Sequence, residues 1–167
     1  MIIRAAAKDD LAAIDALLSR SYPALLKDDY QPSVLVTAIP LISRANPSLV
    51  SSGTYFVVEY GGEILGAGGW TPGAPQGWTK RKRVGHIRHV VTDHTQTRKG
   101  FGRKLMAHIV ANAASADVNQ LECFSTLTAE PFYVACGFRT LGPMMVTLRE
   151  GIDFPAVHMR RFLKRNA

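Results

Sequence analysis

The sequence is poor in cysteine and has no long apolar run. Its only two cysteines are Cys123 and Cys136, so no disulfide framework can hold the fold, and no Cys/His spacing resembles a zinc site. We therefore expect reduced, structural thiols and no metal. No segment approaches the about 18–20 consecutive apolar residues that span a bilayer, and the N-terminus lacks the charged and apolar regions of a signal peptide. We expect a cytoplasmic protein without a membrane partner.

Acidic residues are also in short supply. Thirteen Asp and Glu stand against twenty Lys and Arg, which gives a net charge of +7 at pH 7. A basic surplus suits phosphates, nucleic acid or acidic membranes and does not choose among them. With 47% hydrophobic and 20% charged residues, a chain of 167 residues is an ordinary globular sequence rather than a disordered one. Its length and even composition predict a single domain over residues 1–167.

Apolar periodicity and the positions of glycine and proline predict the secondary structure. The predicted strands cover residues 1–6, 54–60, 63–70, 84–92, 120–126, 138–148 and 156–163. The predicted helices cover residues 9–22, 33–44, 100–116 and 129–137. Asp9 or Asp10 caps the first helix, Tyr22-Pro23 ends it, and Pro40 kinks or interrupts the second. This order predicts an α+β fold in which helices flank a mixed central sheet.

The stretch VTDHTQTRKGFGRKLM, residues 91–106, has the features of an anion site. Two glycines one residue apart, Gly100 and Gly102, are surrounded by four cations where a strand gives way to an amphipathic helix. Uncovered backbone N–H groups, the helix dipole and clustered positive charge all favour an anion there. There is no G-x-x-x-x-G-K-[ST] motif, and Leu105 stands where the dinucleotide fingerprint has its third glycine. The remaining pattern suits a pyrophosphate bound by residues 98–103.

In two separate motifs the sequence resembles the GNAT family of N-acetyltransferases. HIRHVVTDHTQTRKGFGRKLM is similar to the strand, loop and helix with which this family binds acetyl-CoA. STLTAEPFYVACGF is similar to the family's penultimate strand and following helix, with Tyr-x-x-x-Gly-Phe at Tyr133, Gly137 and Phe138. The resemblance covers almost the whole chain. It implies a GNAT-like fold, acetyl-CoA as co-substrate, a small-molecule or peptide amine as acceptor, and a homodimer formed through the C-terminal strands.

The resemblance also implies which residues bind the cofactor. Those matching the family's diphosphate loop are Thr97, Arg98, Lys99, Gly100, Phe101, Gly102 and Arg103, the last four through their amides. Those matching its pantetheine-binding positions are Val90, Val91, Thr92 and Thr128. Two of these depart from the family pattern: Thr97 replaces a usual Arg or Gln, and Thr128 replaces a frequent Asn.

The chemistry of amine acetylation sets the requirements for catalysis. The attacking amine must be neutral, although free amines have pKa values of about 8–10, and the departing thiolate benefits from an acid. Tyr133 is the candidate acid, because a phenol can donate a proton at neutral pH and the family's matching tyrosine usually lies beside the CoA sulfur. The alternative is a tyrosine that only packs its helix on the sheet.

The general base has several candidates. Many members of the family place a glutamate on the fourth strand, and the matching position, fourteen residues before Gly100, is His86. His89, His94 and Asp93 compete with it. Strand alternation puts His86 and His89 on opposite faces unless a bulge intervenes. We expect a water relay organised by His86 or His89; the alternative is that the amine arrives already neutral.

Two other functions compete with acetyl transfer. A CoA-binding sensor would keep the fold without the reaction, and a nucleic-acid-binding module would need cations aligned on one face with stacking aromatics. The cations concentrate instead at the phosphate loop, Lys80–Arg83 and the C-terminal tail, so we expect no nucleic-acid partner. The acceptor stays open: a small amine, amino acid, polyamine, antibiotic or protein N-terminus. Trp70 and Trp78 either wall an acceptor pocket or pack in the core.

Overall fold

Seven strands form one mixed sheet in the computed structural model, which describes residues 1–73 and 81–164. The strands are β1 (Ile2–Ala5), β2 (Tyr55–Tyr60), β3 (Glu63–Thr71), β4 (Val84–Thr92), β5 (Gln120–Thr126), β6 (Arg139–Arg149) and β7 (Ile152–Phe162). The helices are α1 (Leu11–Leu26), α2 (Pro32–Ile42), α3 (Pro47–Val50), α4 (Phe101–Ser115) and α5 (Glu130–Ala135), with 3₁₀ turns η1 (Lys8–Asp10) and η3 (His94–Gln96). The predicted α+β architecture is confirmed.

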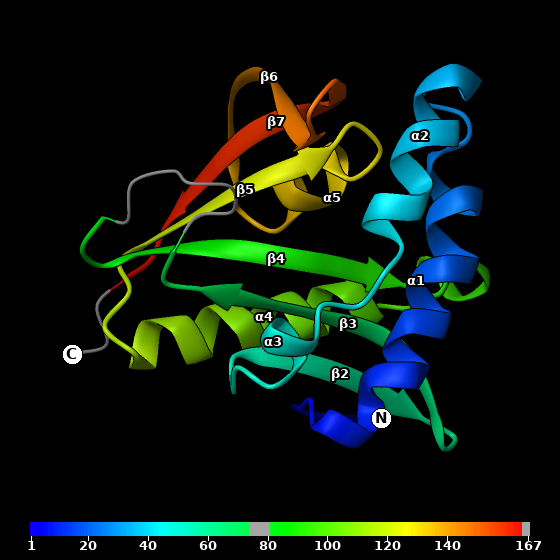
Figure 1. Cartoon of the computed structure of the whole chain (residues 1–167). Helices are drawn as coiled ribbons and strands as arrows, with labels where there is room; N and C mark the ends of the chain where they lie inside the picture. The colour runs from blue at the N-terminus through cyan, green and yellow to red at the C-terminus, as the bar shows by residue number, and fades with distance from the viewer. Residues whose placement is uncertain (74–80, 165–167) are drawn as a thin grey trace.

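The sheet has the order β1-β2-β3-β4-β5-β7-β6, and only β4 and β5 pair in parallel. Their pairing is short: it begins at Val84↔Gln120 and ends at His86↔Glu122. Beyond that point the two strands diverge, as Figure 1 shows between the green β4 and the yellow β5. The divergence leaves the edge of β4 that faces β5 without a strand partner over the rest of its length.

Apolar side chains cover both faces of the sheet. Successive residues of β2 alternate between two buried clusters, with Phe56 in one and Val57 in the other. On the α4 face, Leu105 and Ile109 of α4 are fully buried where the helix packs on β2, β3 and β4. On the α1 face, Ile14 packs with Val57 and other residues of the central strands. Figure 1 shows α1 and α2 on one side of the sheet and α4 on the other.

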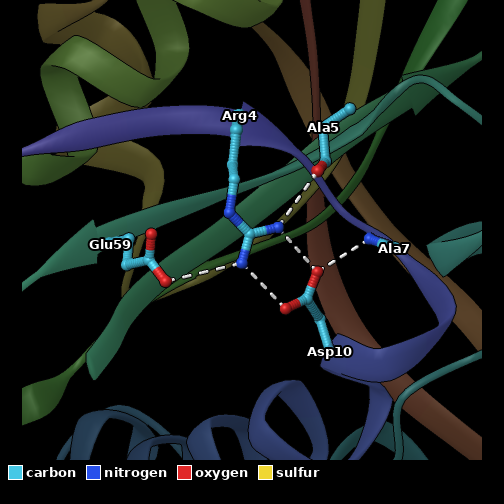
Figure 2. A network of polar contacts seen from close by, with 5 residues as sticks. All are labelled: Arg4, Ala5, Ala7, Asp10 and Glu59. Carbon is cyan, nitrogen blue, oxygen red and sulfur yellow. Dashed lines mark hydrogen bonds and ion pairs between the residues drawn. The ribbon is translucent and has the colours of Figure 1, made fainter. Parts of the chain in front are cut away.

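A polar network fixes the chain between β1 and α1 (Figure 2). The guanidinium of Arg4 binds both carboxylate oxygens of Asp10, at 2.8 and 2.9 Å, and lies 3.5 Å from Oε1 of Glu59. Oδ2 of Asp10 also accepts the backbone N–H of Ala7 at 2.7 Å. The hydrogen bonds from Arg4 hold the pKa of Asp10 below its usual range, although burial opposes them. The network ties β1 and β2 to the turn from which α1 begins.

The helix end expected near Tyr22-Pro23 was wrong, and so was an interruption of the second helix at Pro40. The first helix does not end near Tyr22-Pro23 but continues to Leu26, and α2 runs through Pro40 without interruption. Each proline lies on the exposed side of its helix, where the carbonyl that loses its N–H partner can be hydrated. Burial of neighbouring side chains, such as Leu26, offsets the missing hydrogen bond. Among the described residues, no helix is both long and apolar enough to span a bilayer.

Candidate active site

A cavity of about 960 Å³ occupies the place where β4 and β5 part. This volume is in the range of small-molecule and cofactor sites. Part of its lining comes from β4, the loop before α4, the end of β5, and α5. The rest comes from residues of α1, α2, β6 and β7. The cavity therefore extends from the predicted phosphate loop to a chamber on the α1 face, which is the part lined by α1, α2, β6 and β7.

The two glycines of the phosphate loop have different physical roles. Gly100 is the residue preceding the first turn of α4 and has φ +82°, a left-handed conformation that favours glycine. A β-carbon on Gly100 would meet open space, whereas one on Gly102 would come within 3.0 Å of the Phe132 ring in α5. Gly102 therefore permits α4 and α5 to pack closely. No side chain caps the first turn of α4, so its backbone N–H groups stay available to a ligand.

The side chains around this loop differ in their relation to the cavity. Thr97, Arg98 and Arg103 line it, as do Gly100, Phe101 and Gly102. Lys99 does not line it, and its Nζ donates a hydrogen bond to Oε1 of Gln96 at 2.8 Å. Arg98 has φ +63°, a strained conformation for a residue with a β-carbon. The loop thus offers uncapped amides and two arginines, a combination that fits a diphosphate.

The predicted pantetheine contacts lie along the same cavity. Val90, Val91 and Thr92 line it from the part of β4 that has no strand partner on its β5 side. Thr128 also lines it, but its hydroxyl already donates a hydrogen bond to Oδ2 of Asp29 at 2.7 Å. The backbone of β4 is therefore free to pair with an extended ligand, while the side chain of Thr128 is engaged.

β4 contains a β-bulge at His89, one of the two candidate histidines. Ala67 pairs with Val91 and Gly69 with Arg88, so β4 has one more residue than β3 between these pairs. His89 lies in the bulge with φ +46°, and its carbonyl accepts the hydroxyl of Tyr55 at 3.0 Å. All residues of β4 from 86 to 92 line the cavity, His86 and His89 among them, and the bulge interrupts the simple alternation between these two histidines.

The two rings are neutral near pH 7. Burial lowers the pKa of His86, although the carboxylate of Glu122, 3.6 Å away, opposes this effect. The contact with Glu122 is therefore a polar contact rather than an ion pair. Burial, with a smaller contribution from Arg88, lowers the pKa of His89 to about 4. The carboxylate of Glu122 favours the protonated form of His86, whereas Arg88 disfavours that of His89, which makes His86 the better proton acceptor.

Tyr133 lies at the inner end of the cavity on α5. It is 4% exposed, and its ring packs edge-on against Phe132 and Phe138. Burial raises the pKa of Tyr133 well above its usual value, so the phenol is protonated and can act as a donor.

Asp93 is held in a network of hydrogen bonds, and neither it nor His94 is part of the cavity. Oδ2 of Asp93 accepts Nε of Arg20 at 2.9 Å, and Oδ1 accepts the backbone N–H and the hydroxyl of Thr95 at 2.8 and 2.5 Å. Burial alone would raise the pKa of Asp93, but these hydrogen bonds lower it to about 2. Neither residue lines the cavity. Asp93 is thus a weak base that joins α1 to the turn η3.

Glu122 is a residue of this region that sequence reasoning missed. It is 3% exposed on β5, accepts Nε2 of His158 at 3.1 Å, and is ion-paired with Arg81. Burial would raise the pKa of Glu122, but Arg81 and the two histidines lower it overall. It does not line the cavity and touches it only through His86. The signal that was available is one acidic residue in an otherwise uncharged strand pattern, QLECFST.

Of the two tryptophans proposed either to wall an acceptor pocket or to pack in the core, the structure describes Trp70. Trp70 packs in the core of the α4 face, and its Nε1–H donates to Oδ1 of Asn112 at 2.8 Å, so it does not wall the cavity. Trp78 and Lys80 lie outside the described residues. Within residues 1–73 and 81–164, no group of three or more His, Cys, Asp and Glu side chains could hold a metal ion.

Comparisons with known proteins identify the family. The model of the acetyltransferase (GNAT) domain matches residues 35–161, which is most of the chain. No curated protein matches the sequence. A GCN5-related N-acetyltransferase from Rhodopseudomonas palustris is similar in structure, with a TM-score of 0.77, 17% identity, and coverage of 97% of this chain and 95% of that one.

Two further structures share the fold. The PaiA N-acetyltransferase from Thermoplasma acidophilum, in complex with coenzyme A, has a TM-score of 0.70 and 11% identity over 96% of this chain and 98% of its own. The ribosomal-protein-alanine N-acetyltransferase from Brucella melitensis has a TM-score of 0.64 and 18% identity over 98% and 100%. With the family model matching most of its length, the chain belongs to the GNAT family of N-acetyltransferases.

Proposed function

We propose that the protein transfers an acetyl group from acetyl-CoA directly to a primary amine within a ternary complex. One observation carries the proposal: a single cavity is lined by the phosphate loop, by Tyr133 and by His86. The residues proposed to bind the cofactor, to donate a proton and to accept a proton therefore line the same cavity. No covalent intermediate on the protein is needed, because donor and acceptor can meet where β4 and β5 part.

Acetyl-CoA binding rests on the start of α4. The diphosphate accepts hydrogen bonds from the uncapped amides of Phe101, Gly102 and Arg103, and the side chains of Arg98 and Arg103 add charge. The pantetheine arm lies along the unpaired edge of β4, where Val90, Val91 and Thr92 line the cavity. This placement directs the thioester toward Tyr133.

The transfer step moves one acetyl group and one proton. The amine nitrogen attacks the thioester carbonyl carbon, the new N–C bond forms, and the C–S bond breaks. The amine proton passes through a water to neutral His86, and Tyr133 donates its phenolic proton to the departing thiolate. A backbone N–H on the unpaired edge of β4 is placed to stabilise the oxyanion. Proton exchange with solvent then restores both side chains.

Calorimetric titration with acetyl-CoA at moderate salt, followed by a CoA-thiol release assay over an amine panel, tests the proposal. Gly100→Glu places a carboxylate against the diphosphate and is expected to weaken acetyl-CoA binding by more than about 100-fold. Gly53→Glu is the matched control, since Gly53 has φ +85°, open space around its β-carbon position, and no part in the cavity.

The outcomes separate the competing functions. Binding that is lost in Gly100→Glu, together with thiol release, supports the proposal. Binding without turnover for any amine would favour a CoA-binding sensor. If wild-type protein bound no acetyl-CoA, the proposal would fail, and the basic surface should then be tested against nucleic acid.

A homodimer built through β6 and β7 is part of the same proposal. β6 forms one edge of the sheet, and its outward residues include Leu141 and Met145, which are 41% and 60% exposed. An unpaired edge with apolar side chains favours association with a second chain. Sedimentation velocity of the wild type and of Met145→Glu tests it; a wild-type monomer at micromolar concentration would contradict it.

A further inference from the structure

Arg88 is a half-buried cation without an acidic partner. It lies on β4, lines the cavity, and donates from Nη1 to Oγ1 of Thr71 at 3.3 Å. Among residues 1–73 and 81–164, no carboxylate lies within ion-pair distance of its guanidinium. A guanidinium carries five N–H donors, so most of its hydrogen-bonding capacity is unused. Burial also lowers the pKa of Arg88, as expected for a cation removed from water.

The described side chains that line the cavity carry no negative charge. No Asp or Glu is among its lining residues. The nearby carboxylates are engaged elsewhere: Glu122 with Arg81, Asp93 with Arg20, and Asp29 with the hydroxyl of Thr128. Because His86 and His89 are neutral near pH 7, the charges on the wall are those of arginines. Such a cavity disfavours a polycationic acceptor and favours one with an anionic group.

Arg88 lies apart from the phosphate loop. It precedes the bulge in β4 and pairs with Gly69, whereas Thr92, which leads to the loop, pairs with Gly66. The arginines at the loop, Arg98 and Arg103, suffice for the diphosphate. Arg88 therefore remains for a second anion in the part of the cavity near His86.

The chamber on the α1 face is apolar. Its walls are Leu25 of α1, Leu41 of α2, Val146 and Leu148 of β6, and Phe154 of β7. Val146 and Leu148 face inward because alternate residues of β6 point to the same side. These side chains can bury an aliphatic or aromatic group, which gains free energy from the area removed from water.

We propose that the acetyl acceptor is an amine that also carries a carboxylate and an apolar side chain, as a hydrophobic α-amino acid does. This inference rests on the proposed function. The carboxylate pairs with Arg88, the side chain fills the apolar chamber, and the amine faces the thioester near His86. The acetyl group moves from sulfur to this nitrogen, with the proton transfers described above.

A matched pair of acceptors tests the carboxylate requirement. L-Leucine and L-leucinamide share the amine and side chain, and the amide is the more easily deprotonated amine. With saturating acetyl-CoA, we expect kcat/KM for thiol release to favour L-leucine by a factor of about 10–100, the range for a hydrogen-bonded charge pair. Spermidine should be the poorest acceptor. Equal or better turnover of L-leucinamide or spermidine would overturn the inference and leave the proposed function intact.

Substitution of Arg88 tests whether this residue causes the preference for L-leucine over L-leucinamide. Arg88→Gln should lower kcat/KM for L-leucine by about 10–100-fold while leaving L-leucinamide and the acetyl-CoA dissociation constant unchanged. Arg83→Gln is the control, because Arg83 pairs with Asp117 outside this cavity. A loss that is the same for both acceptors would contradict the assignment. Arg88→Lys keeps one charge and should give an intermediate value.

A binding measurement makes the test independent of turnover. In the presence of CoA, calorimetry should detect N-acetyl-L-leucine binding to the wild type at least about 10-fold more tightly than N-acetyl-L-leucinamide, and this difference should vanish in Arg88→Gln. Equal binding of the two would overturn the inference. If the wild type bound no acetyl-CoA at all, the proposed function would fail first, and the inference with it.

Discussion

Nε2 of His86 lies 3.6 Å from Oε2 of Glu122, at the last residue pair that joins β4 to β5. Behind this pair the strands form a continuous sheet, and in front of it the cavity begins. Glu122 is itself held by Arg81 and His158, so the ring of His86 has a fixed, polar neighbour on its buried side. The proposed proton acceptor is therefore held where the two strands separate.

This arrangement predicts a pH profile. A base acts only when neutral, and burial lowers the pKa of His86 from its ordinary value of 6.5, so we expect the acid limb of kcat/KM below pH 6.5. His86→Gln should lower kcat/KM by about 10²-fold or more at pH 7 and remove that limb. His108→Gln is the control, since His108 packs against Phe56 and does not line the cavity. An unchanged acid limb in His86→Gln would assign it to another group.

Tyr133→Phe should separate chemistry from binding. The substitution removes the phenolic proton and leaves the ring in place, so kcat should fall by about 10²-fold while the acetyl-CoA dissociation constant stays within a factor of about 2. Tyr60→Phe, at a residue that is 56% exposed and outside the cavity, should change neither. The role of Tyr133 would be purely structural if kcat remained at the wild-type level.

The contact between Gly102 and Phe132 predicts a coupled pair of substitutions. Gly102→Ala brings a methyl group to 3.0 Å from the ring, so α4 or α5 must shift. We expect a loss of about 1–2 kcal/mol in the free energy of unfolding, and weaker acetyl-CoA binding. Adding Phe132→Leu should recover part of both losses. A double-mutant cycle by denaturant unfolding measures the coupling, and strict additivity would argue against it.

The pair Arg20–Asp93 predicts acid sensitivity of the folded state. The folded pKa of Asp93, about 2, is below its ordinary 3.8, so its stabilising contribution is present above pH 4 and is lost as the pH falls toward 2. Asp93→Asn should reduce the free energy of unfolding by about 2 kcal/mol at pH 7 and by much less at pH 2. Asp117→Asn should have little effect, because that side chain is 81% exposed. An equal loss at both pH values would point to packing rather than charge.

The sequence predicts this site unevenly, for physical reasons. The start of α4 is predictable, since a left-handed residue such as Gly100 before an apolar helical stripe is a local feature. The bulge at His89 is not, because it arises from the register between β3 and β4, which no single strand determines. Pro40 misleads in the same way: its local preference is real, but buried neighbours keep the helix intact. Glu122 needed knowledge of which strand lies beside β4.

β7 follows β6 in the chain yet lies between β5 and β6 in the sheet. During synthesis, therefore, β6 is made before the strand that joins it to the rest of the sheet. The wall of the apolar chamber formed by β6 and β7 can close only after residue 162, when β7 pairs with β5 along its whole length. A nascent chain shorter than this would expose the edge of β5, so the chamber proposed to bind the acceptor is the part of the nascent protein that most depends on the synthesis of β7.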